Sequence, residues 1–189
     1  MSYYVNNVGA SNEYPETLLD HPEAEKTWDR MLKINCFSVT EMTMIILPQM
    51  IAKKMGAIIN VASASAYRPC PYLSVYAATK SFVSHFTASL KSEYSNSDVF
   101  FQCVYPYYVA TNMSKIKRPS FFAPDADTYA KSALNTVGLE SETNGCLAHS
   151  LQHLIYQVVP RFIYVYMSKK MMLETREKYL RKIGSKKEN

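Results

Sequence analysis

Tyr76 and Lys80 are the residues of this sequence whose types and spacing most directly suggest chemistry. They stand four residues apart, and on a helix this spacing puts two side chains on one face with their Cβ atoms about 6 Å apart. A free phenol has a pKa of about 10, and a fixed ammonium group beside it stabilises the phenolate and lowers that pKa. The pair would therefore suit proton transfer to or from an alcohol or carbonyl oxygen. The alternative is a chance spacing without function, because the chain contains 15 tyrosines.

Ser63 and Asn35 are two further polar residues whose positions suggest a task. Ser63 ends an apolar run of strand length ahead of Tyr76, which places its hydroxyl at the edge of a parallel sheet where such folds bind ligands. There it could hydrogen-bond a substrate carbonyl; alternatively, Ser63 and Ser65 are turn residues that bond to their own backbone. Asn35 lies among apolar residues of a long helix, where asparagine is unfavourable, so it is either a packing defect or an amide placed for function.

The apolar pattern predicts strands that alternate with helices. Two mainly apolar runs, 57–63 and 99–105, have the length and composition of strands covered on both faces of a parallel sheet. The predicted strands span 3–8, 57–63 and 99–105, and the predicted helices span 22–50, 76–94 and 127–137. Pro48 and Gly56 are expected to end the first helix. This order of elements predicts an α/β layer fold around a parallel sheet.

Composition excludes several classes of protein. Of the 189 residues, 48% are hydrophobic and 13% aromatic, which excludes a disordered or fibrous chain. The five glycines are widely separated, so the sequence shows no glycine-rich phosphate loop. The four cysteines form neither a CxxC pair nor a zinc pattern, which favours a reducing compartment. We recognise no apolar run of transmembrane length and no signal peptide.

Basic residues gather at the C-terminus. Residues 169–189 contain eight basic and three acidic residues, which accounts for the whole net charge of +5. An aromatic run, 162–167, precedes this tail. The two segments are expected to lie on an anionic membrane surface; the alternative is a solvated helix end, with the aromatic residues packed on the sheet. Nothing else in the sequence indicates binding to nucleic acid.

Two other kinds of site are disfavoured. His149 and His153 stand four residues apart and could ligate a metal, but we find no third ligand at a useful spacing. Packing positions are therefore favoured for both imidazoles, and no metal is predicted. A serine hydrolase is disfavoured because no GxSxG segment surrounds any serine.

Several of these features occur together in the order and spacing of one large family. The segment Asn6–Gly9, the helical Asn35, Ser63, and the pair Tyr76 and Lys80 resemble the short-chain dehydrogenase/reductase superfamily from the first strand to about Thr111. Further stretches resemble the 17β-hydroxysteroid dehydrogenase type 12 group, also called very-long-chain 3-oxoacyl-CoA reductases; they are Tyr105–Thr111, Lys131–Leu134 with Thr136–Leu139, and Thr143–Gly145. The resemblance implies a Rossmann-like three-layer fold with a parallel sheet, of which this chain would form the C-terminal part.

The resemblance also implies a task for each candidate residue. Tyr76 would donate a proton to a substrate carbonyl oxygen while NADPH delivers hydride to the carbon. Ser63 would orient and polarise that oxygen, Lys80 would lower the pKa of Tyr76 and hold the nicotinamide ribose, and Asn35 would hold a water of the proton relay. The loop from Tyr108 to Thr111 would close over the nicotinamide. The implied cofactor-binding residues are Asn6, Gly9, Tyr76, Lys80, Val109 and Thr111.

The resemblance implies a shortened reductase. Family members begin with a glycine-rich turn that binds the pyrophosphate, whereas this chain would start at the fourth strand. Three βα units of about 30 residues each and an N-terminal membrane segment would therefore be missing. We expect a single domain over 1–189, with part of the catalytic core at 1–111, a substrate loop and helices at 112–168, and the basic tail at 169–189.

The expected activity is NADPH-dependent reduction of 3-oxoacyl-CoA in fatty acid elongation, or of 17-ketosteroids. The alternative is a non-catalytic remnant that acts by association with a full-length partner. The implied location is the endoplasmic reticulum membrane with the active site on the cytosolic side, and Lys186 and Lys187 resemble a dilysine retrieval signal. The expected partners are a lipid or steroid ketone, a membrane surface and, in a homo-oligomer, a second copy of the chain.

Overall fold

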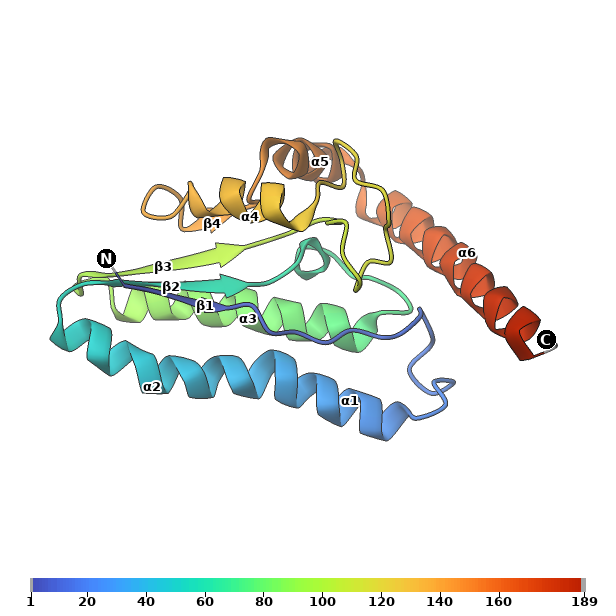
Figure 1. Cartoon of the computed structure of the whole chain (residues 1–189), viewed down its shortest axis with the longest axis horizontal. Coiled ribbons are helices and arrows are strands. Elements are labelled where there is room, and N and C mark those ends of the chain that lie inside the picture. Colours follow the sequence, from blue (N-terminus) through green and yellow to red (C-terminus); the bar gives the residue numbers. More distant parts are fainter. Residues whose placement is uncertain (1, 188–189) are drawn as a thin grey trace.

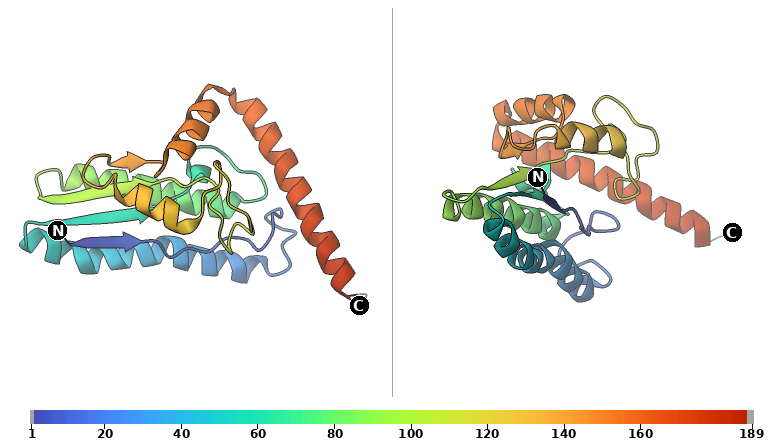
Figure 2. Two further views of the ribbon diagram at one scale, coloured as in Figure 1. Left: turned by 45° about the horizontal axis from the view of Figure 1, so that its top comes forward. Right: turned by 60° about the vertical axis from the view of Figure 1, so that its left-hand side comes forward.

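Four parallel strands form the sheet of the computed structural model, which describes residues 2–187 (Figure 1). Across the sheet they lie in the order β1 (Tyr3–Asn6), β2 (Gly56–Val61), β3 (Val99–Val104) and β4 (Glu142–Thr143). The helices are α1 (Ala24–Leu32), a π-helical turn η1 (Lys33–Phe37), α2 (Ser38–Ala52), a 3₁₀ turn η2 (Ala64–Ala66), α3 (Ser74–Glu93), α4 (Ala126–Leu134), α5 (Leu147–Val158) and α6 (Arg161–Lys187). Figures 1 and 2 show α1, α2 and α3 on one face of the sheet and α4 and α5 on the other.

Apolar residues on both faces of β2 hold these layers together. Ile58 is buried in one cluster with Leu47 and Phe101, on the face covered by α2 and α3. Ile59, the next residue, packs against Tyr129 of α4 on the other face. Successive side chains of a strand point to opposite faces, so a strand covered on both sides is apolar throughout. The predicted α/β class, parallel sheet and three layers are therefore confirmed.

The helix predicted for 22–50 extends to Ala52 and contains a π-helical turn, so Pro48 does not end it as predicted. The proline ring removes the hydrogen bond to the carbonyl of Met44. Met44 is 66% exposed, so water can bond to this carbonyl and the helix continues. By length and composition, Ala24–Ala52 could also cross a membrane, contrary to our expectation that no run is long enough. In this fold α2 packs on the sheet, and its buried residues are Val39, Thr43, Leu47 and Met50.

Helix α6 joins two segments that the sequence analysis treated as separate. The aromatic run 162–167 forms its first turns, and the basic residues from Lys169 onward continue the same helix. The expected boundary between 168 and 169 therefore falls inside a helix. Within the aromatic run, Tyr164 packs against Tyr156 of α5 at 5.4 Å between ring centroids, whereas Phe162 and Tyr166 are 75% and 70% exposed. The last two residues of the dilysine pattern, 188 and 189, lie outside the described residues.

The far part of α6 contacts the loop that follows β1. Arg176 forms an ion pair with the buried Glu16, with 2.6 Å between the guanidinium nitrogen and the carboxylate oxygen. Tyr179 stacks on Tyr14 at 4.7 Å between ring centroids, and its hydroxyl donates to the carboxylate of Glu13. These contacts join the two ends of the described chain.

Candidate active site

Ser63 and Tyr76 meet at the carboxyl end of β2. Ser63 follows the strand by two residues, and Tyr76 lies in the first turn of α3. The Ser63 hydroxyl lies near enough to the Tyr76 hydroxyl to affect its pKa. Ser63 Oγ also accepts a hydrogen bond from the backbone N–H of Ser65 at 3.2 Å. Ser63 therefore stabilises its own turn, as the alternative interpretation expects, and also lies beside Tyr76. Burial raises the pKa of Tyr76, and the nearby Ser63 hydroxyl opposes this shift.

Lys80 lies one helical turn after Tyr76 and is buried. Its Nζ donates a hydrogen bond to the carbonyl of Val61 at 2.9 Å and stands 5.9 Å from the centroid of the Tyr76 ring. Burial lowers the pKa of Lys80 to about 8, so the amine is mostly protonated at neutral pH. The expected lowering of the Tyr76 pKa is not found. At this distance from the ring, with its hydrogen bond directed to Val61, the ammonium group does not outweigh the burial of the phenol.

Asn35 fixes the chain that follows β1. It lies in the π-helical turn η1, is 1% exposed, and its Oδ1 accepts a hydrogen bond from the N–H of Ala10 at 2.7 Å. Its Nδ2 donates to the carbonyl of Ala10 and to Thr79 Oγ1, each at 2.9 Å. Both N–H groups of the amide therefore have protein partners, so a water held by this side chain would bond to Oδ1. Turns of π-helix often occur at functional sites.

Gly9 brings the same segment close to Lys80. A Cβ atom at Gly9 would stand 3.4 Å from Lys80 Nζ and 3.6 Å from Asn35 Oδ1. The absence of a side chain thus keeps the space beside the ammonium group open. Ser63, Tyr76, Lys80, Asn35 and Gly9 form one group at the carboxyl ends of β1 and β2, as expected for a ligand site of a parallel sheet.

Asn6 occupies a place different from that expected of a residue lining a cofactor. Its side chain is buried, and its Nδ2 donates to Asn60 Oδ1 at 2.7 Å. Asn60 in turn donates to Thr87 Oγ1 at 2.9 Å. Asn6 follows the exposed Val5 in β1, so the alternation of the strand turns its amide into the core. The side chain of Asn6 therefore ties β1 to β2 and, through Asn60, to α3.

Val109 and Thr111 lie in the loop after β3, which Ser114 holds in shape. Ser114 Oγ donates to the carbonyl of Val109 at 2.6 Å and accepts from the N–H of Thr111 at 3.2 Å. Val109 also packs against the apolar cluster around Ile59. In the same loop, burial raises the pKa of Tyr108, and the nearby phenol of Tyr76 contributes to this shift. At the start of the loop, the carbonyl of Pro106 accepts a hydrogen bond from the N–H of Ala64 at 2.8 Å, so the loop borders the group formed by Ser63, Tyr76 and Lys80.

His149, for which we expected a packing position, holds this loop from the other side. Its buried Nδ1 accepts a hydrogen bond from the N–H of Tyr107 at 3.3 Å, and its Nε2 lies 3.2 Å from the carbonyl of Tyr108. These partners assign the proton to Nε2, and burial lowers the pKa of the imidazole. His153 lies against Tyr67 at 4.1 Å between ring centroids. Within residues 2–187, no group of three or more metal-ligating side chains is found.

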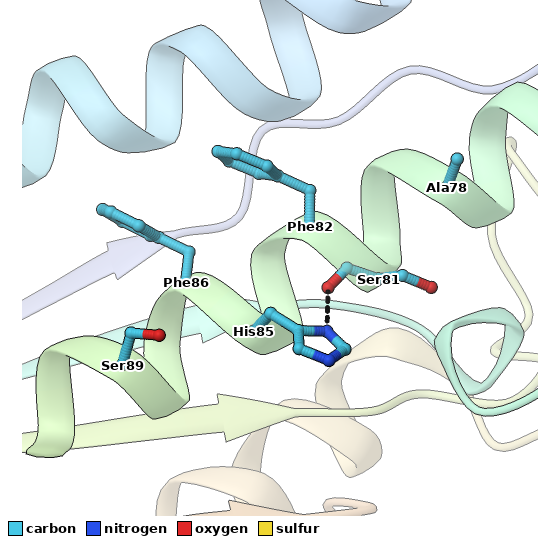
Figure 3. Close-up of a pocket in the computed structure, with 6 residues that line it drawn as sticks. All are labelled: Ala78, Ser81, Phe82, His85, Phe86 and Ser89. Atoms are coloured by element: carbon cyan, nitrogen blue, oxygen red, sulfur yellow. Dashed lines mark hydrogen bonds between the residues drawn. The ribbon is translucent and has the colours of Figure 1, made fainter.

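A groove of about 390 Å³ on α3 lies apart from these residues (Figure 3). It is lined by Ala78, Ser81, Phe82, His85, Phe86 and Ser89. Figure 3 shows these side chains along one side of α3, with His85 bonded back to the carbonyl of Ser81. The buried Thr79, Lys80 and Val83 occupy the other side of the helix, so this groove is separate from the candidate active site.

Comparison with known proteins agrees with this fold. Residues 2–120 match the family described as short chain dehydrogenase. The chain belongs to the short chain dehydrogenase family. It is also similar to the human very-long-chain 3-oxoacyl-CoA reductase, with 45% identity over 178 residues that cover 94% of this chain and 57% of the human protein. The duck (Anas platyrhynchos) very-long-chain 3-oxoacyl-CoA reductase is 43% identical over the same shares of the two chains. The chain thus spans just over half the length of these relatives.

Solved structures of the short chain dehydrogenase fold resemble this chain as a whole. The structure described as giving insights into 7β-hydroxysteroid dehydrogenase stereoselectivity has a TM-score of 0.74 and 16% identity, covering 89% of this chain and 66% of that one. A short-chain dehydrogenase from Sphingobium yanoikuyae in complex with NADPH has a TM-score of 0.65 and 20% identity, covering 85% and 66%. These likenesses support the fold.

Thr79 is a residue of this candidate site that the sequence analysis missed. Its buried hydroxyl accepts a hydrogen bond from Asn35 and donates to the carbonyl of Tyr76 at 2.7 Å. It therefore connects the π-helical turn to the first turn of α3. The signal was present in the sequence, because Thr79 lies three residues after Tyr76 and so on the same helical face.

Proposed function

We propose that this protein is a ketoreductase in which the hydroxyl of Tyr76 donates a proton to a substrate carbonyl oxygen. The observation that carries the proposal is the grouping of Ser63, Tyr76 and Lys80 at the carboxyl end of β2. Two neighbouring hydroxyls beside a buried ammonium group provide a proton donor, an orienting group and a positive charge at one place. Reduction of a carbonyl to an alcohol needs these three from the protein.

Each residue has a separate task in the proposed reaction. Ser63 donates a hydrogen bond that orients the carbonyl oxygen, and Tyr76 transfers its proton as negative charge develops on that oxygen. Lys80 stabilises the phenolate that remains. Because burial raises the pKa of Tyr76, the hydroxyl keeps its proton until the substrate oxygen becomes basic. Thr79 and Asn35 act as positioning residues, since they fix the backbone of Tyr76.

The proposed cofactor is NADPH, which supplies the hydride when bound. Within residues 2–187, Lys80 Nζ donates one hydrogen bond, to Val61, and an ammonium group has three N–H donors. The two other donors suit the hydroxyls of a ribose, and Gly9 leaves space beside them. With Tyr76 and the loop at Val109–Thr111, these residues fit a nicotinamide nucleotide. The NADPH complex of the Sphingobium relative supports the choice of the phosphorylated form.

The proposed substrate is a 3-oxoacyl-CoA with a long acyl chain. Support comes from the curated relatives at 43–45% identity, which bear the name very-long-chain 3-oxoacyl-CoA reductase. The 17-ketosteroids implied by the resemblance share the reacting carbonyl and differ in shape. The proposed location is the cytosolic face of the endoplasmic reticulum membrane, which the basic excess along α6 supports.

The proposal is tested by a reductase assay on the protein expressed from its natural reading frame. NADPH oxidation is followed with a long-chain 3-oxoacyl-CoA and, separately, with a 17-ketosteroid. Tyr76→Phe removes only the hydroxyl, and the rate should fall at least about 100-fold, because a positioned general acid contributes roughly that factor. Tyr94→Phe, the same substitution at the end of α3, is the matched control and should keep the rate. A Tyr76→Phe protein that retains more than about a tenth of the rate contradicts the assignment.

A further inference from the structure

Arg68 joins the loop that precedes Tyr76 to the end of helix α5. Its guanidinium group donates a hydrogen bond to the carbonyl of Val159 at 2.6 Å and another to the carbonyl of Gln157 at 3.1 Å. The last carbonyls of a helix have no partner within the helix, and Pro160, which has no N–H, follows directly. The dipole of a helix also favours a cation at this end. Arg68 therefore caps α5 from a loop that lies 89 positions earlier in the chain.

The same guanidinium group lies against helix α6. Its central carbon is 5.3 Å from the centroid of the Tyr164 ring, a cation–π contact. Tyr164 packs edge to face on Tyr156 of α5 at 5.4 Å between ring centroids. Figure 2 shows α5 and α6 meeting at a corner, which we call the α5–α6 junction. Two residues after Arg68, Cys70 Sγ lies 3.9 Å from the Oγ of Ser168 in α6, so the loop contacts both helices that form the junction.

Phenol rings lead from the α5–α6 junction to the candidate active site. Tyr107 stacks on Tyr156 at 5.6 Å between ring centroids. Its neighbour Tyr108 is 47% exposed, and the phenols of Tyr156 and Tyr76 both lie near enough to affect its pKa. Tyr156 and Tyr164 are half-buried. A long acyl chain on a carbonyl held at Tyr76 would lie along these rings, whereas a short acyl group would end beside Tyr76.

We propose that Arg68 is a positioning residue that holds the α5–α6 junction beside the candidate active site and so sets the affinity for a long acyl chain. This inference rests on the ketoreductase function proposed above and names a residue that selects substrates by chain length. The planar guanidinium group donates to two carbonyls at once, a geometry that a lysine does not provide. Since its partners are main-chain carbonyls and a ring, we assign it no proton transfer.

Steady-state kinetics on the protein expressed from its natural reading frame test this proposal with two substrates that share coenzyme A. Arg68→Met keeps an unbranched side chain and removes the guanidinium group. The KM for a long-chain 3-oxoacyl-CoA should rise about tenfold, the equivalent of one hydrogen bond to a charged group. The kcat should stay within about twofold, because a loss of uniform binding raises KM alone. The KM for acetoacetyl-CoA, whose acyl group is short, should be unchanged.

Two further variants show whether the guanidinium group itself is needed. Arg68→Lys keeps the positive charge without the planar fork, so its KM for the long-chain substrate should lie between those of the unmodified protein and Arg68→Met. Arg161→Met removes an exposed arginine at the start of α6. It is the matched control, and its KM should stay within about twofold of the unmodified value. Gel filtration of each variant checks that it remains folded.

Hydrogen exchange of the same proteins without substrate or cofactor separates this proposal from the ketoreductase function. In Arg68→Met, the amides of α5 and that of Tyr107, which bonds to His149, should exchange at least about fivefold faster. The amides of the buried strand β2 should be unaffected. If the unmodified protein has no reductase activity, the proposed function is wrong, whereas unchanged exchange in Arg68→Met means that Arg68 does not hold the junction.

Three results would overturn the proposal. The first is that Arg68→Met leaves both the long-chain KM and the exchange of α5 unchanged. The second is that its KM rises equally for acetoacetyl-CoA, which would assign Arg68 to the phosphates of coenzyme A. The third is that Arg161→Met raises the long-chain KM as much as Arg68→Met does, which would make the effect one of general charge.

Discussion

Replacing Asn35 by alanine tests whether this residue fixes the segment beside the candidate active site. The substitution removes one hydrogen bond accepted from the N–H of Ala10 and two donated by the amide, to the carbonyl of Ala10 and to Thr79. Ala10 is half-buried and Thr79 is buried. Thr79 keeps its hydrogen bond to the carbonyl of Tyr76, whereas both polar groups of Ala10 lose a partner.

The expected loss of stability follows from these three bonds. Each contributes about 1 kcal/mol, and an unsatisfied buried group costs about 1–3 kcal/mol. Because water can reach half-buried Ala10, we take the lower end for its two groups and about 1 kcal/mol for Thr79. Alanine recovers about 0.7 kcal/mol through its higher helix propensity. The free energy of unfolding should therefore fall by about 2–3 kcal/mol, and the midpoint of thermal unfolding by roughly 4–12 °C for a chain of this length.

Two measurements check this prediction on the same protein. Urea unfolding followed by circular dichroism gives the change in free energy, and hydrogen exchange reports whether the Ala10 amide opens. Asn35→Asp keeps the acceptor for Ala10 but places an oxygen opposite its carbonyl, so it should destabilise at least as much as alanine does. Asn7→Ala, at an exposed asparagine, is the control and should change stability by less than about 0.5 kcal/mol.

The result that would refute the reasoning is a loss below about 1 kcal/mol for Asn35→Ala, with an unchanged exchange rate at Ala10. The two backbone hydrogen bonds would then be dispensable, and the conformation of the segment after β1 would have another cause. Asn35→Asp adds an independent check, since equal stability of the asparagine and aspartate proteins would mean that the orientation of the amide does not matter.

Three further predictions concern two turns of the fold, the loop after β3 and the candidate site. Gly145→Ala should destabilise the fold by about 2–5 kcal/mol in urea unfolding, because its φ is +80° and the new Cβ would overlap the ring and hydroxyl of Tyr129. Gly138→Ala should destabilise it by only about 1–2 kcal/mol, because the φ of Gly138 is +84° but no atom lies within 4 Å of the new Cβ. Burial lowers the pKa of His149 from 6.5, so the folded state binds fewer protons than the unfolded chain, and stability should fall as the pH drops below about 6.5. In His149→Asn, the midpoint of thermal unfolding should depend less steeply on pH across that range. Lys80, with a pKa of about 8, should lose its charge as the pH rises through that value. A reduction rate that stays level up to about pH 10 would contradict the proposed role of Lys80 in stabilising the phenolate of Tyr76.

The two central strands could be predicted because their composition reflects their burial, whereas the two-residue strand β4 was not predicted. β2 and β3 are apolar at nearly every position, as strands covered on both faces must be, and the structure places them within two residues of the predicted ends. The first helix was harder. A proline usually ends a helix, but Pro48 follows a solvent-facing turn around Met44. That exposure depends on the packing of α2 and cannot be inferred from the local sequence.

The candidate site could be predicted where helix geometry fixes it and not where tertiary contacts decide. Tyr76 and Lys80 share a face because they are four residues apart on α3. The burial of the Asn6 side chain could not be predicted, because one residue of strand alternation decides whether its amide faces the core or the sheet edge. The pKa of Tyr76 was expected to fall because a cation was foreseen nearby, yet the depth of burial, which dominates, becomes visible only in the folded structure.

The ion pair between Arg176 and Glu16 joins residues 160 positions apart in the chain, and this separation has a kinetic consequence. Closing so long a loop is entropically costly, so contacts of high sequence separation tend to form after the local parts of the sheet and its helices have assembled. A contact that is absent from the folding transition state affects the unfolding rate alone. We therefore expect Arg176→Met to leave the refolding rate of the chain unchanged and to accelerate its unfolding, so that α6 acts on how long the folded state lasts more than on how quickly it is reached.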